Sequence, residues 1–523
     1  MQLQVLLVFS VLVIFGAATS ALAAYGLHLY VLLLLFRRRV RSKTASQQRT
    51  VREYPCGRAE GDWPHVTTQI PIYNEWDVAE RILSATAAMD YPKGRHEIQV
   101  LDDSTDGTRQ LIDNIAGRLR AAGADIKVVR RATRTGYKAG ALAHGLTVAR
   151  GEYIAIFDAD FVPPADFLRK AVPLIATDGR LACLQGRWTH LNRDESWLTE
   201  AQALGVDGHF AIEQGARAWN GLMMNFNGTA GIWRRTALED PAVGGWSADT
   251  LTEDLDISYR AQLAGWRLDY CFDLPCPAEL PNTIAAFKSQ QRRWATGSIQ
   301  VARKLLPRIW LSRIGLGEKI EATLHLTHYS VSFWMFVLAL IALPMARIVG
   351  LLESGSTWMK VGWLVVLCST VAPSLVYMYA RHLVGGRWSG IRTIPSMLVL
   401  GCGLCVSNAL AFLRGLFTRG GEFVRTPKSG SIGTAPKASS YQVVQSRLWM
   451  FEMSLGLYTL VTFVSYLMDV HRGISIFMLI YAVGLLITGW MSRPRKARRA
   501  PAAGAPAHAP LPSVVGPEPA AAP

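Results

Sequence analysis

The chain has 523 residues, apolar side chains at half of its positions and a formal net charge of +16. This length allows one large or two ordinary domains with a substantial buried core. The positive charge concentrates beside apolar segments, at 37–43, 303–313 and 493–499, where it suits an anionic membrane surface. We therefore expect contact with membrane lipids and no nucleic-acid partner.

The first predicted element is an apolar helix at 5–36, which contains no charged side chain. It exceeds the roughly 20 residues that a helix needs to cross a bilayer. The basic run Arg37–Lys43 follows, and the positive-inside rule keeps it in the cytoplasm, so 1–43 is predicted as a membrane anchor. A cleaved signal peptide is the alternative because "ATSALA" offers small residues, but no basic residue precedes the apolar run.

Residues 44–300 read as a soluble domain in which strand-like and helical runs alternate. The strand-like runs "HVTTQIPIY", "EIQVLDDS", "DIKVVRR" and "EYIAIFDAD" are separated by helical runs such as "DVAERILSATAAM". This alternation predicts a Rossmann-like α/β fold with a parallel sheet and crossover helices. Ligands of such folds collect at the carboxyl ends of the strands.

Polar clusters follow three of these strands. Aspartates also start turns and cap helices, so any single cluster could be structural. Three clusters at the same edge of one sheet indicate a site. Their members are Tyr73 and Glu75 after the first strand, Asp102 and Asp103 after the second, and Asp158 and Asp160 after the fourth.

Asp158 and Asp160 are expected to converge, because residues two apart on a strand point the same way. Their oxygens suit a hard cation such as Mg²⁺ or Mn²⁺, whose coordination phosphate oxygens usually complete. Lys138 in "GYKAGAL" is placed to join them, so the pattern suggests a nucleotide-diphosphate ligand.

Two motifs lie beyond the strands. In "LTEDLDIS", Thr252 could cap a helix and Glu253 and Asp254 could stabilise its dipole; the functional alternative is a general base at the helix tip. In "QQRRW", an arginine can neutralise a diphosphate and a tryptophan offers a flat face to a sugar ring, although Arg-Trp pairs also occur at ordinary membrane interfaces.

The C-terminal part contains five apolar segments. If all five crossed the membrane, the basic loop after the third and the basic tail would both lie outside, against the positive-inside rule. We therefore expect 389–416 to lie in the interface or to re-enter, which leaves five spans including the first helix. The segments lie near 322–349, 359–380, 391–413, 447–468 and 474–491.

The motifs "IPIYNE", "LDDSTDGT", "KAGAL", "FDADF", "QGRWTHLN", "FNGTAGIWR", "LTEDLDIS", "ELP" and "QQRRW" occur in this order. The chain thereby resembles membrane-bound family 2 glycosyltransferases, most closely the cellulose synthase-like enzymes that make β-mannan or glucomannan. The resemblance implies a cytoplasmic GT-A domain at 44–300 between one N-terminal and about four C-terminal transmembrane helices. It further implies interfacial helices at 301–320, a channel region at 321–492, a disordered tail at 493–523, and a bacterial inner membrane or its equivalent.

The resemblance also implies residue roles. Tyr73, Glu75 and Asp102 or Asp103 would hold the nucleotide, with Glu253 also at the donor, Lys138 at the diphosphate, and Asp158 and Asp160 at the sugar and metal. Asp254 would be the catalytic base, and Gln290, Arg293 and Trp294 would brace the diphosphate and the acceptor. In "FVRTPK", Phe423, Thr426 and Lys428 match a gating loop at 421–430, although Arg425 replaces the usual valine.

The implied reaction is an inverting single displacement. Hexose would pass from GDP-mannose or UDP-glucose to a growing glycan, giving β-1,4-mannan, glucomannan or β-glucan that crosses the membrane, with any export partner unidentified. The alternatives are single transfer to a lipid such as a diacylglycerol, and a catalytically silent transporter or scaffold.

Overall fold

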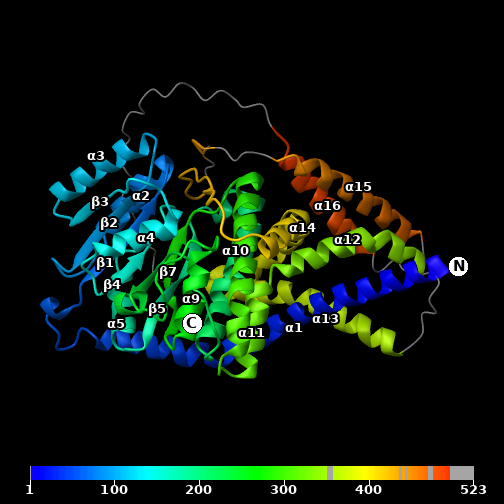
Figure 1. The fold of residues 1–523 in the computed structure, drawn as a ribbon, viewed down its shortest axis with the longest axis horizontal. Coiled ribbons are helices and arrows are strands. Elements are labelled where there is room, and N and C mark those ends of the chain that lie inside the picture. Colours follow the sequence, from blue (N-terminus) through cyan, green and yellow to red (C-terminus); the bar gives the residue numbers. More distant parts are fainter. Residues whose placement is uncertain are drawn as a thin grey trace.

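The computed structural model of the chain describes residues 2–349, 357–434, 437, 439–441, 446–468 and 475–494. Within them, an α/β domain adjoins a bundle of long helices (Figure 1). The tail predicted at 493–523 lies outside the described residues from 495 onward.

One sheet of seven strands forms the centre of the α/β domain. The strands are β1 (Val66–Ile72), β2 (His96–Asp102), β3 (Ile126–Val129), β4 (Tyr153–Ile156), β5 (Leu181–His190), β6 (Gly231–Arg234) and β7 (Arg267–Ala278). Their order is β3-β2-β1-β4-β6-β5-β7. The four strands predicted from the alternation, β1 to β4, are parallel, as expected.

The sheet as a whole is mixed, which corrects the prediction of a parallel sheet. β6 runs antiparallel to both of its neighbours, β4 and β5, whereas β7 is parallel to β5. β5 therefore ends at the same edge at which β6 begins, and the helices between them do not carry the chain across the sheet. Residue periodicity identifies a strand but not the direction in which it enters a sheet.

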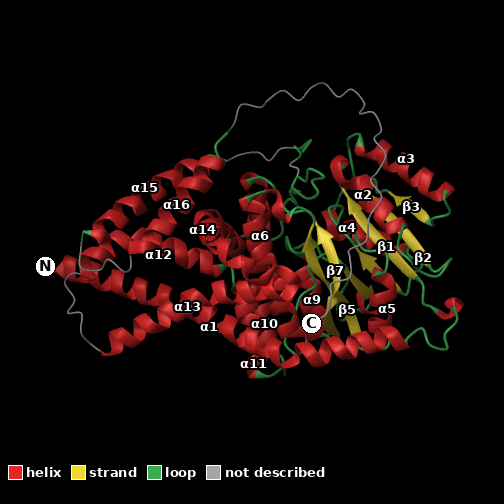
Figure 2. Ribbon diagram, turned by 180° about the vertical axis from the view of Figure 1, so that it is seen from behind, coloured by secondary structure: helices red, strands yellow, loops and turns green. Residues whose placement is uncertain are grey.

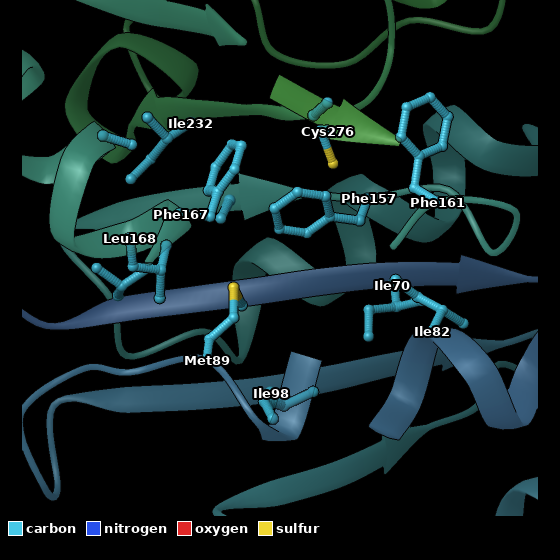
Figure 3. Close-up of a cluster of buried hydrophobic side chains, with 14 of the residues drawn as sticks. Ile70, Ile82, Met89, Ile98, Phe157, Phe161, Phe167, Leu168, Ile232 and Cys276 are labelled. Carbon is cyan, nitrogen blue, oxygen red and sulfur yellow. The ribbon is translucent and has the colours of Figure 1, made fainter. Parts of the chain in front are cut away.

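Helices cover both faces of the sheet (Figure 2). They are α2 (Trp76–Ala87), α3 (Thr108–Ala121), α4 (Tyr137–Thr147), α5 (Phe167–Ala176), α6 (Trp197–Gly208), α7 (Gln214–Ala218), α8 (Arg235–Leu238) and α9 (Glu253–Leu263), with short turns η1 (Glu60–Asp62), η2 (Arg193–Glu195) and the π-helix η3 (His209–Glu213). β4 alternates between two cores, because Ala155 packs with α2 and α5 while Ile154 and Ile156 pack with α4 and α9. Figure 3 shows the first core, where Phe157 and Phe167 meet at 4.9 Å.

The first helix, α1 (Gln2–Glu53), is longer than predicted and joins the bundle to the α/β domain. Leu32 and Phe36, inside the predicted span at 5–36, are buried in the second core of the domain. Phe36 stacks on Trp219 with ring centroids 5.5 Å apart. The end of the apolar run is therefore packed against protein, and the predicted boundary between 43 and 44 falls within a continuous helix. Apolarity alone does not separate core-facing from lipid-facing side chains.

The bundle comprises the remaining helices. They are α10 (Ile284–Leu311), α11 (Leu316–Thr327), α12 (Ser330–Val349), α13 (Thr357–Arg381), the short helices η4 (His382–Gly386) and η5 (Arg387–Arg392), α14 (Ile394–Phe417), α15 (Leu448–Leu467) and α16 (Ser475–Met491). By length and composition, four helices of the described chain could cross a membrane, and a fifth span arises if the bent pair α11 and α12 counts as one. The four are Gln4–Glu53, Leu364–Gly386, Ile394–Phe417 and Leu448–Leu467.

α14 covers the segment that was predicted to lie in the interface or to re-enter. It is one continuous helix of 24 residues, and it packs against α10, α12 and α16 (Figure 1). Its length and composition would also permit a span. The position of α14 relative to a membrane stays a prediction.

Candidate active site

The carboxyl edge of the sheet faces a cavity of about 1100 Å³ that continues between the helices of the bundle. On the bundle side it is lined by residues such as Tyr25, Met335 and Tyr377. Every site residue predicted from the sequence except Asp102 also lines it. These residues are Tyr73, Glu75, Asp103, Lys138, Asp158, Asp160, Glu253, Asp254, Gln290, Arg293, Trp294, Phe423, Thr426 and Lys428.

Asp158 and Asp160 face this cavity from a turn after β4, not from the strand itself as predicted. A lysine accompanies each carboxylate. Lys138 Nζ donates to Asp158 Oδ1 at 2.5 Å, and Lys428 Nζ donates to Asp160 Oδ2 at 2.5 Å. Both carboxylates therefore face the same cavity from a turn, and each is paired with a different lysine.

Lys138 supplies a fixed positive charge in the cavity. Burial lowers the pKa of this ammonium, but Asp158 and Glu253 outweigh it and hold the pKa above its ordinary value. Burial raises the pKa of Asp158, as does Asp160, whereas Lys138 lowers it. Lys138 also donates to the carbonyl oxygen of Gly228 at 2.9 Å, so its position is defined by partners on two loops, the one after β4 and the one before β6.

The two carboxylates of Asp158 and Asp160 are ligands of the right chemical type for a divalent cation, but they are too few to bind it alone. Among the described residues, no group of three or more His, Cys, Asp or Glu side chains is placed to hold a metal ion. Asp158 and Asp160 offer the hard oxygen ligands that Mg²⁺ and Mn²⁺ take. Two carboxylates leave several coordination positions open, so they suit an ion whose other ligands come from a bound diphosphate and water.

Tyr73 and Asp103 form the wall of the cavity near β1 and β2. The Arg134 guanidinium carbon lies 3.4 Å from the centroid of the Tyr73 ring. The Arg131 guanidinium donates two hydrogen bonds to the Asp103 carboxylate, from Nε at 3.1 Å and from Nη2 at 2.5 Å. Asp102 instead accepts from Arg130 at 2.8 Å and from the Ser104 amide at 2.9 Å, away from the cavity. Of the two aspartates proposed for the nucleotide, only Asp103 therefore lines the cavity.

Glu75 is a largely buried acid, with 13% of its side chain exposed, beside the two aspartates of the turn. Burial raises the pKa of Glu75 to about 7, although the Arg425 guanidinium, 3.6 Å away, lowers it. A carboxyl with such a pKa exchanges protons near neutral pH. Whether Glu75 is ionised near neutral pH therefore depends on the charges of any ligand in the cavity.

Asp254 lies in the first turn of α9, with Glu253 beside it. Thr252 occupies the N-cap position but makes no side-chain capping bond within the described chain. The hydrogen bond on which a purely structural role of this motif would depend is therefore missing. Burial and the neighbouring Glu253 raise the pKa of Asp254 to about 7. The geometry therefore places a carboxyl that can take up a proton at a helix tip facing the cavity.

Helix α10 contributes Gln290, Arg293 and Trp294 to the opposite wall. Trp294 lies 6.5 Å from Trp188, which stacks on Phe210 at 4.7 Å with an interplanar angle of 20°. These rings form an aromatic surface of the kind on which sugar rings pack. Sequence reasoning missed Trp188 as a site residue, although "QGRWTHLN" contains it.

The predicted gating loop at 421–430 lies over the cavity. Phe423 lies under the Arg293 guanidinium, 4.2 Å from ring centroid to guanidinium carbon. Arg425, which departs from the expected valine, donates to the Tyr73 carbonyl at 3.4 Å and stacks on Tyr441 at 4.2 Å. Thr426 is buried. The arginine therefore has contacts at the cavity rim that a valine could not make.

The mixed sheet is GT-A-like, and acids and lysines gather where its carboxyl edge meets the cavity. Residues 64–297 match the family described as "Glycosyltransferase like family 2". Over this part of the chain, the match confirms the resemblance inferred from the motifs.

The chain is also similar to curated plant enzymes. It is 42% identical over 252 residues to glucomannan 4-beta-mannosyltransferase 2 of Arabidopsis thaliana, covering 47% of each chain. It is 41% identical over 251 residues to a probable glucomannan 4-beta-mannosyltransferase 11 of Oryza sativa subsp. japonica, covering 47% of this chain and 44% of the relative. The matches thus span about half the length of the curated relatives.

A solved structure of the mannosyltransferase PcManGT from Pyrobaculum calidifontis, in complex with GDP-Man and Mn²⁺, is 20% identical in sequence. The match covers 76% of this chain and 99% of that one, with a TM-score of 0.46.

Proposed function

We propose that the chain is an inverting glycosyltransferase that builds a β-linked polysaccharide from a nucleotide-diphosphate sugar. The observation that carries the proposal is the single cavity that joins Asp254, Lys138 and Trp294 and extends into the helix bundle. GDP-mannose and UDP-glucose are the candidate donors. The names of the plant relatives favour a β-1,4-mannan or glucomannan product.

Asp254 is the general base of the proposed reaction. Its pKa of about 7 suits a carboxylate that accepts a proton near neutral pH. It removes the proton from an acceptor hydroxyl, whose oxygen attacks the anomeric carbon as the bond to the nucleoside diphosphate breaks on the opposite face. An α-linked donor therefore yields a β-linked product.

Positive side chains around the cavity bind the donor diphosphate. Lys138 and Arg293 both line the cavity and carry charges that complement phosphate oxygens. Asp158 and Asp160 would hold Mg²⁺ or Mn²⁺, which when bound supplies positive charge to the departing diphosphate. Tyr73 and Asp103 hold the nucleoside end.

The acceptor glycan lies against Trp294 and Trp188 and leaves between the bundle helices. The cavity reaches Tyr377 and Tyr481, on helices α13 and α16, which supports an exit along this route. We place the catalytic domain in the cytoplasm of a multi-pass membrane protein, in a bacterial inner membrane or its equivalent, because basic clusters adjoin the apolar helices.

Membranes that contain the protein, incubated with one radiolabelled nucleotide sugar at a time and with Mg²⁺ or Mn²⁺, test this function. We expect labelled polymer that survives lipid extraction. Label confined to the lipid extract would instead show transfer to a lipid. Nucleotide binding without transfer from either donor would favour a silent scaffold.

A further inference from the structure

Glu279 directly follows β7 and connects two parts of the candidate site through its main chain. Its backbone amide donates to the Asp160 carbonyl at 3.1 Å. Its backbone carbonyl accepts from Lys428 Nζ at 2.6 Å, and the same ammonium is the one paired with Asp160. Asp160 and Lys428 are 268 residues apart in sequence, and Glu279 fixes both.

The Glu279 carboxylate holds the end of the loop at 421–430. Oε1 accepts from the Ser429 amide at 2.7 Å and from the Ser429 hydroxyl at 3.0 Å. Oε2 accepts from the Gly430 amide at 3.1 Å and from Arg81 Nη2 at 2.9 Å. A carboxylate has about four acceptor sites, and these four donors use them. All acceptor sites of the Glu279 carboxylate are therefore used by protein donors, and none is left for a ligand.

The chain at Gly430 is shaped for this contact. Gly430 has φ +72°, and a Cβ atom there would lie 2.7 Å from the Asp77 carbonyl oxygen of α2. Beyond it, Asp77 accepts from the Ser440 amide at 2.8 Å. The loop end thus lies between Glu279 and α2, with its two consecutive amides turned toward one buried carboxylate.

We propose that Glu279 is a positioning residue for the transfer reaction, one that acts through Lys428. By anchoring Ser429 and Gly430, it places the neighbouring ammonium at Asp160 and keeps the loop over the donor. The inference rests on the proposed function, and it assigns Glu279 no contact with substrate. Glu279→Gln replaces one acceptor oxygen by an NH2 group, so only one of the two loop amides can keep its acceptor, and the partly buried Arg81 loses its charged partner.

Hydrogen exchange of the intact protein tests the contact without turnover. Glu279→Gln is expected to raise amide exchange in the peptide that contains Ser429 and Gly430 at least tenfold more than in peptides of the sheet. The matched control is Glu97→Gln, a buried carboxylate of β2 that accepts from Lys127 at 2.7 Å and does not line the cavity. Unchanged exchange at 429–430 in Glu279→Gln would overturn the proposal.

A second measurement separates positioning from simple stability. Binding of GDP and of UDP with Mn²⁺ is expected to weaken about tenfold in Glu279→Gln but not in Glu97→Gln, with the donor KM rising more than kcat falls. Equal loss in both variants would contradict positioning. Should Glu279→Gln not fold, Ser429→Ala, which leaves the carboxylate and Arg81 in place, is expected to weaken nucleotide binding in the same direction; wild-type binding in it would overturn the proposal. If the wild type binds neither nucleotide, the proposed function fails, while hydrogen exchange still decides whether Glu279 holds the loop.

Discussion

Gly228 and Asp254 lie so close together that a Cβ atom on the glycine would come within 2.8 Å of Asp254 Oδ2. The same added atom would lie 3.2 Å from Lys138 Nζ. Gly228 has φ +81°, which disfavours other residues at this position. The loop before β6 therefore passes the proposed base at a distance that only glycine allows.

Gly228→Ala is expected to lower kcat/KM by about 100-fold, the cost of displacing a catalytic group by about 1 Å. Gly221→Ala is the matched control, because Gly221 has φ +71° but nothing lies within 4 Å of its added Cβ. The two variants should lose similar melting temperature and differ in activity. Equal activity in both would show that Asp254 does not need its observed position.

The pKa of Asp254 predicts opposite pH trends for activity and stability. A base must be ionised, so kcat/KM should rise through about pH 7 and fall to about one tenth of its plateau at pH 6. The folded pKa lies above the ordinary value of 3.8, so this carboxyl favours folding at low pH and loses that contribution as pH rises to about 7. A kcat/KM profile that is flat between about pH 5.5 and 8 would exclude Asp254 as the base.

Lys428→Met removes the ammonium that Asp160 and the Glu279 carbonyl share. Loss of one charged hydrogen bond, worth roughly 1.5–3 kcal/mol, should raise the donor KM about 10- to 100-fold. Lys437→Met is the control, because the Lys437 side chain is exposed and does not line the cavity. An unchanged donor KM in Lys428→Met would show that the loop does not contribute to donor binding.

Trp188→Ala should shorten the polymer and slow transfer, because it removes the ring stacked on Phe210 next to Trp294. An aromatic contact of about 0.5–1.5 kcal/mol corresponds to a loss of up to about tenfold. Trp188→Phe should retain most of the product length. Product of wild-type length from Trp188→Ala, measured by size-exclusion chromatography, would remove this ring from the acceptor path.

Much of the site could be predicted because short motifs follow strands. Tyr73 and Asp103 come directly after β1 and β2, Asp158 is the second residue after β4, and a parallel arrangement brings such positions to one edge. The direction of β6 could not be predicted, since it depends on where the helices before it return the chain. The packing of Phe36 inside the domain could not be predicted from the sequence either, because its neighbour Trp219 lies far along the chain.

The missed residues share one property. Arg134, Trp188 and Glu279 gain their significance from partners distant in sequence. Trp188 and Glu279 lie in the motifs "QGRWTHLN" and "ELP", but the motifs alone do not assign them a role. Glu279 meets Ser429 across 150 positions. Arg425 was noted only as a departure from the usual valine, whereas the structure gives it contacts with Tyr73 and Glu75.

The purified protein and its Asp254→Asn variant, each given labelled GDP-mannose or UDP-glucose, provide the most direct test. We predict that the wild type forms polymer degraded by a β-specific endo-hydrolase. The variant should form at least about 100-fold less while it still binds GDP or UDP, because only the base is lost. Polymer formation by Asp254→Asn at the wild-type rate, or a product resistant to every β-specific hydrolase, would contradict an inverting transfer at this cavity.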